Sequence, residues 1–199
     1  MCGIVGYIGK QKAQQILIEG LKREIYRGYD SEGIVILNKQ KPVCIKAVGK
    51  LENLELKLVN QYLEGNVGLG HCRWATHGEP SEKNAHPQTD CKKNIFLVHN
   101  GIIENYKILK EKLIQEGHKF SSDTDTEVIA HLIEKFFNGN LEEATRKALQ
   151  LVKGTYGLAI ISRDDPEKLV VARNSSPLLI GLGDKEYIVA SDPAAIISR

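Results

Sequence analysis

The sequence predicts an α+β fold in which antiparallel sheets are covered by helices. Short strand-like segments gather at both ends of the chain, whereas helical periodicity dominates its middle. This order favours antiparallel strands over an alternating strand–helix–strand arrangement around a parallel sheet. No internal repeat, low-complexity stretch or linker divides the 199 residues. We therefore expect residues 1–199 to form one domain with a sizeable core.

The composition excludes several classes of function. Hydrophobic residues make up 42% of the chain and charged residues 26%, which is ordinary for a soluble globular protein. The 27 basic and 25 acidic side chains are mixed along the sequence, so we expect neither nucleic-acid nor membrane binding. The chain has no apolar run of membrane-spanning length and no signal peptide. We expect a cytoplasmic protein with reduced cysteines.

A metal site is not expected, although histidines and cysteines are frequent in one part of the chain. The residues concerned are His71, Cys72, His77, His86, Cys91 and His99. No CxxC pair occurs, and the spacings match no paired-ligand zinc pattern. We therefore expect neither a metal nor another cofactor.

The first 72 residues predict a mixed order of strands and helices. Apolar residues and glycines at 3–8 are typical of a buried strand, and Ala13, Leu17 and Leu21 recur every four residues as in an amphipathic helix. The expected elements are a strand at 3–8, a helix at 11–25, a glycine-rich loop at 27–33, strands at 33–37 and 43–48 joined by a polar turn at 38–42, a helix at 51–63 and a strand at 67–72.

Residues 73–91 show neither helical nor strand periodicity. A connection of this length inside a domain is usually functional or disordered. Trp74, Pro80, His86 and Pro87 favour an ordered loop. It also contains the only tryptophan of the chain.

The remainder of the chain predicts three helices followed by four strands. Thr124 and Glu127 have the spacing of a capping box, with Thr124 as N-cap and Glu127 reaching back, and Gly117 and Gly154 stand at expected helix ends. The expected elements are a strand at 95–98, helices at 104–116, 124–136 and 141–152, and strands at 156–162, 169–173, 178–182 and 187–190, with a turn at 164–166. Asp192-Pro193 then resembles the start of a further helix, so we expect the chain to continue in a longer protein.

Cys2 follows the initiator methionine and can become the first residue, because methionine is readily removed before a small side chain. Its thiol, with a pKa of about 8.5, and its α-amine, with a pKa of about 7.7–8.0, would then share one carbon. Part of the amine is unprotonated at neutral pH and can accept the thiol proton, which combines nucleophile and base in one residue. Taken alone, the stretch favours another interpretation, a small apolar residue in a terminal strand.

The other candidate residues each have an ordinary structural explanation. An arginine such as Arg73 is usually a surface charge. A carboxylate such as Asp125 is favoured at a helix N-terminus, and Asn100-Gly101 is common in turns. Trp74, His77 and His86 are residue types that most often serve packing and hydrogen bonding.

Together, five segments resemble one family. They are MCGIVG at 1–6, YRGYDS at 26–31, GHCRWATHG at 70–78, HNGIIENY at 99–106 and TDTE at 124–127. They stand in the order found in class II glutamine amidotransferases, and the chain looks like the glutaminase domain of the glutamine–fructose-6-phosphate aminotransferases. The resemblance covers almost the whole chain. It implies the N-terminal-nucleophile hydrolase fold, a four-layer αββα sandwich of two antiparallel sheets.

The resemblance also implies the chemistry of the site. Cys2 would attack the side-chain amide of L-glutamine with its own α-amine as base, forming a thioester and releasing ammonia. Asn100 and Gly101 match the oxyanion hole, which supplies donors where negative charge develops. Arg73 suits the α-carboxylate of the substrate as a planar fork, and Asp125 suits the α-ammonium.

Further positions follow from the same resemblance. Thr76 and His77 would lie around the substrate, and Trp74 in a loop that closes over it. Arg27 and His86 are motif positions expected near the site. Two residues depart from the family pattern at positions that are not catalytic: Cys72 stands where threonine is expected and Glu32 where alanine is expected.

The implied partners are sugar-isomerase domains of the same polypeptide, outside this chain. They would use the ammonia to convert fructose 6-phosphate to glucosamine 6-phosphate in a homo-oligomeric enzyme. One alternative is the glutaminase half of another amidotransferase, such as the phosphoribosyl-pyrophosphate enzyme, although residues 74–77 and 27–29 favour the first interpretation. A second alternative is a non-catalytic glutamine-binding module.

Overall fold

The computed structural model describes residues 2–38 and 41–197. Met1 therefore lies outside the described residues, as do Lys39 and Gln40 of the expected turn at 38–42. All four cysteines are free thiols, as expected. Within the described ranges, no helix has both the length and the apolar character needed to cross a bilayer.

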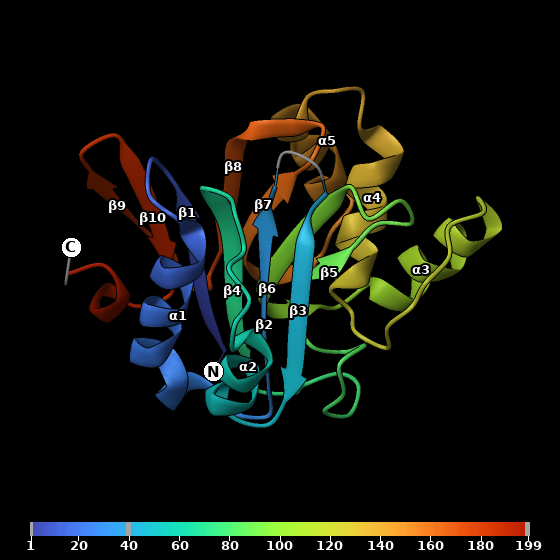
Figure 1. Ribbon diagram of the computed structural model, residues 1–199. Helices are drawn as coiled ribbons and strands as arrows, with labels where there is room; N and C mark the ends of the chain where they lie inside the picture. The colour runs from blue at the N-terminus through green and yellow to red at the C-terminus, as the bar shows by residue number, and fades with distance from the viewer. Residues whose placement is uncertain (1, 39–40, 198–199) are drawn as a thin grey trace.

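Within the described residues, the strands form two antiparallel sheets that lie face to face (Figure 1). The six-stranded sheet contains, in order, β3 (Val43–Val48), β2 (Ser31–Leu37), β4 (Val67–Arg73), β1 (Gly3–Ile8), β10 (Glu186–Ala190) and β9 (Leu179–Gly183). The four-stranded sheet contains β5 (Gln88–Thr89), β6 (Ile95–Ile103), β7 (Gly154–Ser162) and β8 (Asp165–Asn174). The first strand of the chain is thus held between two neighbours.

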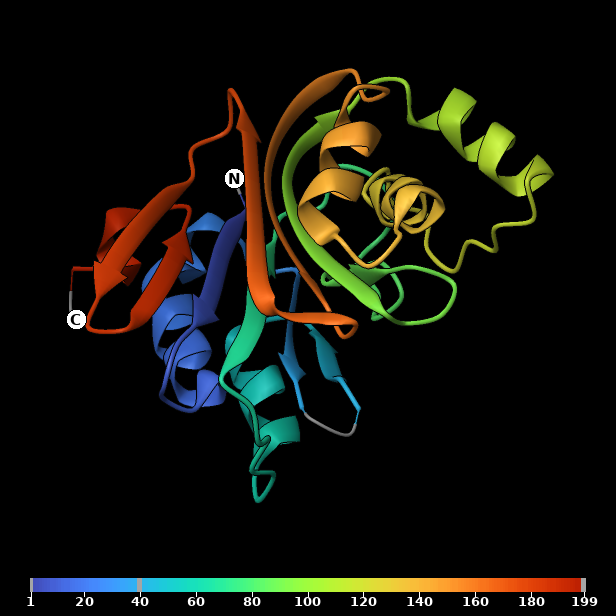
Figure 2. The same ribbon diagram turned by 90° about the horizontal axis from the view of Figure 1, so that it is seen from above.

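Helices cover the outer face of each sheet and complete four layers (Figure 2). The helices α1 (Ala13–Glu24) and α2 (Leu51–Leu58) pack on the six-stranded sheet. The helices α4 (Glu127–Phe136) and α5 (Leu141–Leu149) pack on the four-stranded sheet, with α3 (Tyr106–Gln115) outermost. Short 3-10 turns lie at Ile25–Arg27 and Pro193–Ala195. The expected four-layer α+β sandwich is confirmed.

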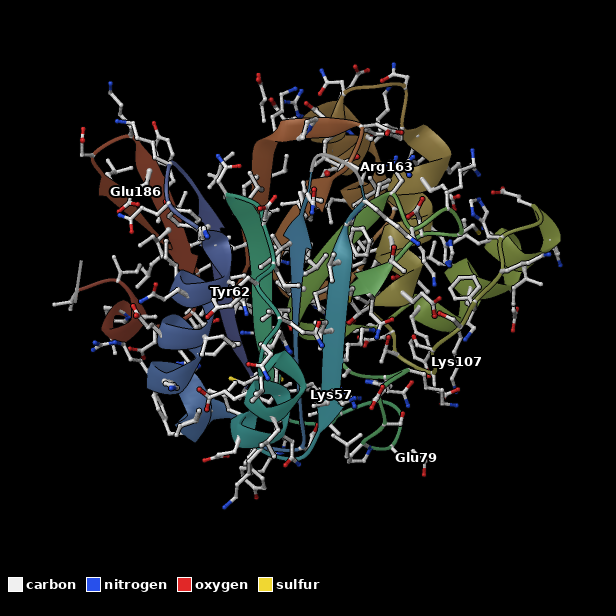
Figure 3. All side chains as sticks on the ribbon, viewed as in Figure 1. Lys57, Tyr62, Glu79, Lys107, Arg163 and Glu186 are labelled. Atoms are coloured by element: carbon white, nitrogen blue, oxygen red, sulfur yellow. The ribbon has the colours of Figure 1, made fainter. Side chains whose placement is uncertain are left out.

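The strand period of two divides apolar side chains between separate cores. In β1, Ile4 faces the second sheet, whereas Val5 faces the helices, and both are fully buried. Gly68 and Gly70 of β4 lie under α1, where an added Cβ would come within 2.9 and 3.1 Å of leucine methyl groups. The alternating glycines therefore allow α1 to pack closely on the sheet. On α2, Lys57 donates to the Lys46 carbonyl of β3 and ties the helix to the sheet (Figure 3).

Several expected boundaries are wrong because strand pairing overrides local composition. The loop expected at 27–33 ends early, since Ser31 and Glu32 pair with β4 and begin β2. The strand expected at 95–98 continues to Ile103 by pairing with β7, so Asn100-Gly101 is not a turn. The short strand β5 lies inside the expected loop at 73–91, and β8 begins at Asp165, inside the expected turn at 164–166.

Two helices are shorter than expected, and the last one is a single turn. The helix expected at 51–63 ends at Leu58, because the backbone turns extended at Val59 and Asn60 has a φ of 61°. The helix expected at 141–152 ends at Leu149, and Gly154 instead begins β7. The helix expected after Asp192 is one 3-10 turn within the described residues.

The capping box expected at Thr124 is also wrong. Helix α4 begins at Glu127 with Thr126 as N-cap, and Thr124 bonds Ser122 through its hydroxyl at 2.8 Å. Glu127 does reach back, but its carboxylate accepts the N–H groups of Ser121 and Ser122 at 2.7 and 2.6 Å. The N–H groups of Ser121 and Ser122 give this carboxylate two hydrogen bonds, whereas the capping box would give it only the single N–H of Thr124.

The two departures from the family pattern lie directly opposite one another in the sheet. Glu32 of β2 pairs with Cys72 of β4, and both residues are buried. Neither carboxyl oxygen of Glu32 has a hydrogen-bond partner among the described residues. Burial raises the pKa of Glu32 to about 9, so the folded protein holds this side chain protonated at neutral pH.

We expect Glu32→Gln to change how stability depends on pH. The pKa of Glu32 is about 9 in the folded protein and about 4.3 in the unfolded chain. The folded state therefore binds an extra proton between these values, and stability falls as pH rises, by roughly 1.4 kcal/mol per pH unit. Urea unfolding from about pH 5 to about pH 9 should show a decline that is shallower in the glutamine variant. Part of the decline remains, because burial also raises the pKa of Glu24 to about 8.

The matched control is Glu111→Gln on the exposed side of α3, which should follow the parent protein. Parallel pH curves for the parent and Glu32→Gln would contradict the assignment of a buried neutral carboxyl.

Candidate active site

One cavity of about 360 Å³ is lined by residues from both sheets and by the loop that follows β4. All ten site residues expected from the sequence line it: Cys2, Arg27, Arg73, Trp74, Thr76, His77, His86, Asn100, Gly101 and Asp125. They come from positions up to 123 residues apart, and the fold brings their side chains together around one cavity. His99, Thr124, Thr126, Thr155 and Ser176 also line the cavity.

Cys2 is fixed at the entrance to β1 by hydrogen bonds at both its thiol and its carbonyl. The N–H of Trp74 donates to the sulfur at 3.1 Å. The Cys2 carbonyl accepts from Asn100 Nδ2 at 2.8 Å and from Arg27 Nε at 3.1 Å. Burial raises the pKa of the thiol, and the Trp74 N–H opposes this effect. Because the thiol is held neutral, Cys2 needs a nearby base to act as a nucleophile.

Arg27 positions Cys2. It is 7% exposed, and its guanidinium also forms a 3.3 Å ion pair with Asp192. Asp192 precedes the last 3-10 turn, so Arg27 links the two ends of the described chain around Cys2. The sequence indicated its proximity to the site but gave no role.

Two residues that the sequence analysis did not select orient the Asn100 amide. His71 Nε2 lies 3.0 Å from Asn100 Oδ1, and Ser191 Oγ accepts from Asn100 Nδ2 at 2.8 Å. Burial lowers the pKa of His71 to about 3, so its imidazole is neutral and donates through Nε2. The amide nitrogen of Asn100 is thereby turned toward Cys2. His71 lies within a recognised motif, but Ser191 follows β10 and had no local signal.

His86 supports this arrangement from behind. Its Nδ1 lies 3.2 Å from His71 Nε2, and the two rings are tilted with centroids 4.3 Å apart. Complete burial holds the pKa of His86 well below its ordinary value. Both histidines are therefore neutral structural groups near neutral pH, and neither supplies the base that Cys2 needs.

Gly101 is required by the backbone. Its φ is 137°, and an added Cβ would lie 2.1 Å from the carbonyl oxygen of Thr155 on β7. Only glycine combines this conformation with so close an approach. The backbone of β6 therefore reaches the cavity directly beside Asn100.

Two buried charged residues that line the cavity are incompletely hydrogen-bonded. Arg73, 3% exposed, donates through Nη2 to the carbonyls of His77 and Gly78, while Nη1 has no partner among the described residues. Asp125, 4% exposed, accepts the Ile103 N–H through Oδ2 at 2.7 Å, and its Oδ1 lies 4.0 Å from His77 Nδ1. Unpaired buried charge is costly unless a ligand completes it, and these groups match an anion and a cation.

The loop after β4 is anchored at its base and open at its tip. The Asp30 carboxylate accepts the Ala75 N–H and the Ser31 hydroxyl. Trp74 is 48% exposed, with its ring edge-on to Tyr29 at 5.3 Å. Thr76 is exposed. Beyond this exposed tip, the loop is tied to β4 again, because Arg73 donates to the His77 and Gly78 carbonyls.

Comparison with curated proteins finds relatives along the whole chain. Glutamine–fructose-6-phosphate aminotransferase [isomerizing] of Thermococcus kodakarensis is 54% identical over 199 residues, covering 99% of this chain and 33% of the relative. The enzymes of Clostridium tetani and Pyrococcus horikoshii, with the same name, are 51% and 52% identical and each covers 100% of this chain. The chain thus spans about a third of the length of these relatives (33%).

Solved structures agree on the fold. The glutamine phosphoribosylpyrophosphate amidotransferase of B. subtilis superimposes with a TM-score of 0.85 at 30% identity, over 99% of this chain and 44% of the other. A glutamine aminotransferase class-II domain protein of Silicibacter pomeroyi, 15% identical, has a TM-score of 0.62 over 95% of this chain and 88% of its own. This second match supports the fold alone.

A family model described as a glutamine amidotransferase domain matches residues 71–198, well over half of the chain. The matched segment contains Arg73, Asn100, Gly101 and Asp125, and the cavity adds Cys2 to them. The chain therefore belongs to the glutamine amidotransferase domain family.

Proposed function

We propose that this chain hydrolyses the side-chain amide of L-glutamine to glutamate and ammonia through a thioester on Cys2. The observation that carries the proposal is the meeting, in one cavity, of a fixed thiol, the Asn100 amide beside Gly101, and the oppositely charged Arg73 and Asp125. Arg73 Nη1 has no partner among the described residues, and Asp125 Oδ1 has only the 4.0 Å contact with His77. A glutamine molecule presents a reactive amide, an α-carboxylate and an α-ammonium. Each of these has a matching group in the cavity.

The reaction begins after Met1 is removed and the α-amine of Cys2 is free. The amine takes the thiol proton, and the sulfur attacks the amide carbon of glutamine. The oxyanion accepts hydrogen bonds from Asn100 Nδ2 and from the Gly101 N–H. Asn100 Nδ2 already donates to the Cys2 carbonyl and to Ser191 Oγ, so one of these bonds gives way to the oxyanion. Collapse of the intermediate breaks the C–N bond, and ammonia leaves with the proton held by the amine.

A water molecule completes the cycle. The free amine of Cys2 takes a proton from water, and the resulting hydroxide attacks the thioester carbon. The oxyanion again accepts hydrogen bonds at Asn100 and Gly101, and the C–S bond breaks. Glutamate leaves and the thiol recovers its proton. The same groups thus serve both half-reactions: the α-amine accepts and returns a proton in each one.

The two charged groups select an α-amino acid over a simple amide. The free Nη1 of Arg73 binds the α-carboxylate, and Oδ1 of Asp125 binds the α-ammonium. Trp74, Thr76 and His77 belong to the loop that closes over the substrate. Closure would exclude bulk water until the thioester has formed.

The acceptor of the ammonia is proposed to be fructose 6-phosphate. Support comes from the relatives, which carry that substrate in their name at 50–54% identity, whereas the phosphoribosylpyrophosphate enzyme is 30% identical. Residues 1–199 would form the glutaminase domain, and sugar-isomerase domains would follow in the remaining length that the relatives possess. The four free thiols suit a reducing compartment, and we place the protein in the cytoplasm. The full-length enzyme would form a homo-oligomer.

We expect Cys2→Ala to abolish ammonia release from L-glutamine while leaving the thermal unfolding curve nearly unchanged. The substitution removes the sulfur that forms the thioester but keeps the clamped carbonyl. Ammonia and glutamate should be measured together. The matched control is Cys44→Ala, an exposed thiol on β3 that should retain full activity. Glutamine binding without turnover in the parent protein would instead favour the non-catalytic module.

We expect Asn100→Ala to lower kcat about 10²–10³-fold, as for other oxyanion donors, with little change in KM. Steady-state kinetics with L-glutamine measure both constants. Asn53→Ala, which removes an exposed side-chain bond to the Val48 carbonyl, is the control and should leave them unaltered. An equal rise in KM would indicate that Asn100 binds the ground state and does not act at the oxyanion.

We expect Arg73→Lys to raise KM for glutamine roughly 10- to 100-fold, the cost of one charge-assisted hydrogen bond. Lysine keeps the positive charge but cannot reproduce the fork that spans two carbonyls and the substrate. Arg163→Lys is the control, because Arg163 is exposed (Figure 3) and does not line the Cys2 cavity. Unchanged KM in Arg73→Lys would reject the carboxylate role.

A further inference from the structure

Four metal-ligating side chains meet away from the cavity that holds Cys2. Cys91 follows β5, His118 follows α3, and His131 and Glu134 lie on α4. One donor atom from each residue lies within 4.8 Å of all the others. None of the four lines the Cys2 cavity. The cluster therefore has no part in the proposed glutamine chemistry.

The donor atoms are spaced as the corners of one coordination polyhedron. Cys91 Sγ lies 3.6 Å from His131 Nδ1 and 3.9 Å from His118 Nδ1. Glu134 Oε2 lies 3.1 and 2.8 Å from the same two nitrogens. Zinc bonds of about 2.0–2.3 Å in a tetrahedron separate the ligand atoms by roughly 3.3–3.8 Å. The shortest of these separations, 2.8 Å, must lengthen and the longest, 3.9 Å, must shorten for zinc to bind, while the remaining pairs of donor atoms lie within 4.8 Å. Side-chain movements would therefore complete the coordination.

The local structure points all four ligands inward. His131 and Glu134 are three residues apart on α4 and share one face of the helix. The N–H of Lys119 donates to Cys91 Sγ at 3.3 Å, and the N–H of Cys91 lies 3.5 Å from Glu134 Oε2. These bonds hold the sulfur and the carboxylate on the same side of the cluster.

His131 has the outer partner that a metal-bound histidine usually has. It is fully buried, and its second nitrogen, Nε2, lies 3.5 Å from Glu127 Oε1. That nitrogen makes no hydrogen bond within the described residues. Metal binding at Nδ1 fixes the proton on Nε2, where it faces the Glu127 carboxylate, and this carboxylate–histidine–metal arrangement recurs in zinc sites. The ring of Phe120 packs on His131 at 4.4 Å and closes the inner side.

The donor set identifies the class of ion. Calcium and magnesium prefer oxygen ligands throughout, whereas two imidazole nitrogens, one thiolate and one carboxylate suit zinc. Four protein ligands leave no open position, which is typical of a structural site. We propose that Cys91, His118, His131 and Glu134 bind one structural zinc ion that joins the loop after β5, the end of α3 and helix α4.

This inference departs from the expectation that the protein holds no metal. Sequence spacing did not indicate the site, because Cys91 and His118 stand 27 positions apart and only His131 and Glu134 are close in the chain. The zinc patterns that can be read from sequence have two close pairs of ligands. Here one ligand from each of two loops meets a pair on a helix.

Cobalt titration of the untagged, metal-free chain tests the proposal independently of catalysis. One equivalent of Co²⁺ should produce the intense visible bands of a tetrahedral site and a near-ultraviolet thiolate-to-cobalt charge-transfer band. Zinc should displace it at the same stoichiometry. Chelation of a zinc-loaded sample should lower the midpoint of thermal unfolding by roughly 5–10 °C, as expected for an ion bound well above its dissociation constant.

Matched variants assign the bands to these ligands. Cys91→Ser should lose the charge-transfer band. It should also weaken cobalt binding by more than the roughly 10- to 100-fold that is typical when a residue hydrogen-bonded to a metal ligand is changed. His118→Gln, which changes a partly exposed ligand and so spares the core, should lose the tetrahedral bands. Cys44→Ser and Cys2→Ala should retain both. Binding below one equivalent, or equal binding in Cys91→Ser and Cys44→Ser, would overturn the proposal and leave a metal-free hydrogen-bonded cluster.

Discussion

The site depends on how the second residue of the chain is held. Termini normally fray, but the Cys2 carbonyl accepts hydrogen bonds from Asn100 of the opposite sheet and from Arg27 after α1. Each donor is fixed in turn, Asn100 by His71 and Ser191, and Arg27 by Asp192. Because these partners come from both sheets and from the last turn of the described chain, the whole sandwich must form before the nucleophile is in place.

The cavity concentrates features that oppose stability. Arg73 and Asp125 are buried without complete pairing, and Gly101 adopts a left-handed conformation against the Thr155 carbonyl. Such groups cost free energy in the empty protein and are compensated only when a ligand completes them. His71 and His86, which lie behind Asn100, differ from these residues: burial keeps both imidazoles neutral, so no unpaired charge arises there. Arg27 is buried as well, but it is paired with Asp192. In the proposed site, incompletely paired charge remains at Arg73 and Asp125, the residues proposed to bind the charged groups of glutamine.

Sequence patterns predicted most of the strands and helices in order, and the ten residues selected from motifs all line one cavity. Both features rest on local periodicity or on motifs. They did not predict Ser191, which meets Asn100 only after β10 pairs with β1. They misplaced the capping box, since Glu127 binds two N–H groups whose position depends on the fold. The cluster around His131 was missed for the same reason. What escaped prediction lies in contacts between segments that are distant in the sequence.

In the proposed mechanism, Cys2 is active only as the first residue, with its free α-amine as the base. Intact-mass analysis of samples with different degrees of Met1 removal, paired with the rate of glutamine hydrolysis, tests this requirement. We expect a rate proportional to the fraction of chains that lack Met1, reaching zero when every chain retains it. Full activity in protein that keeps Met1 would rule out the α-amine as base, because the nitrogen of Cys2 would then be an amide and could not accept the proton.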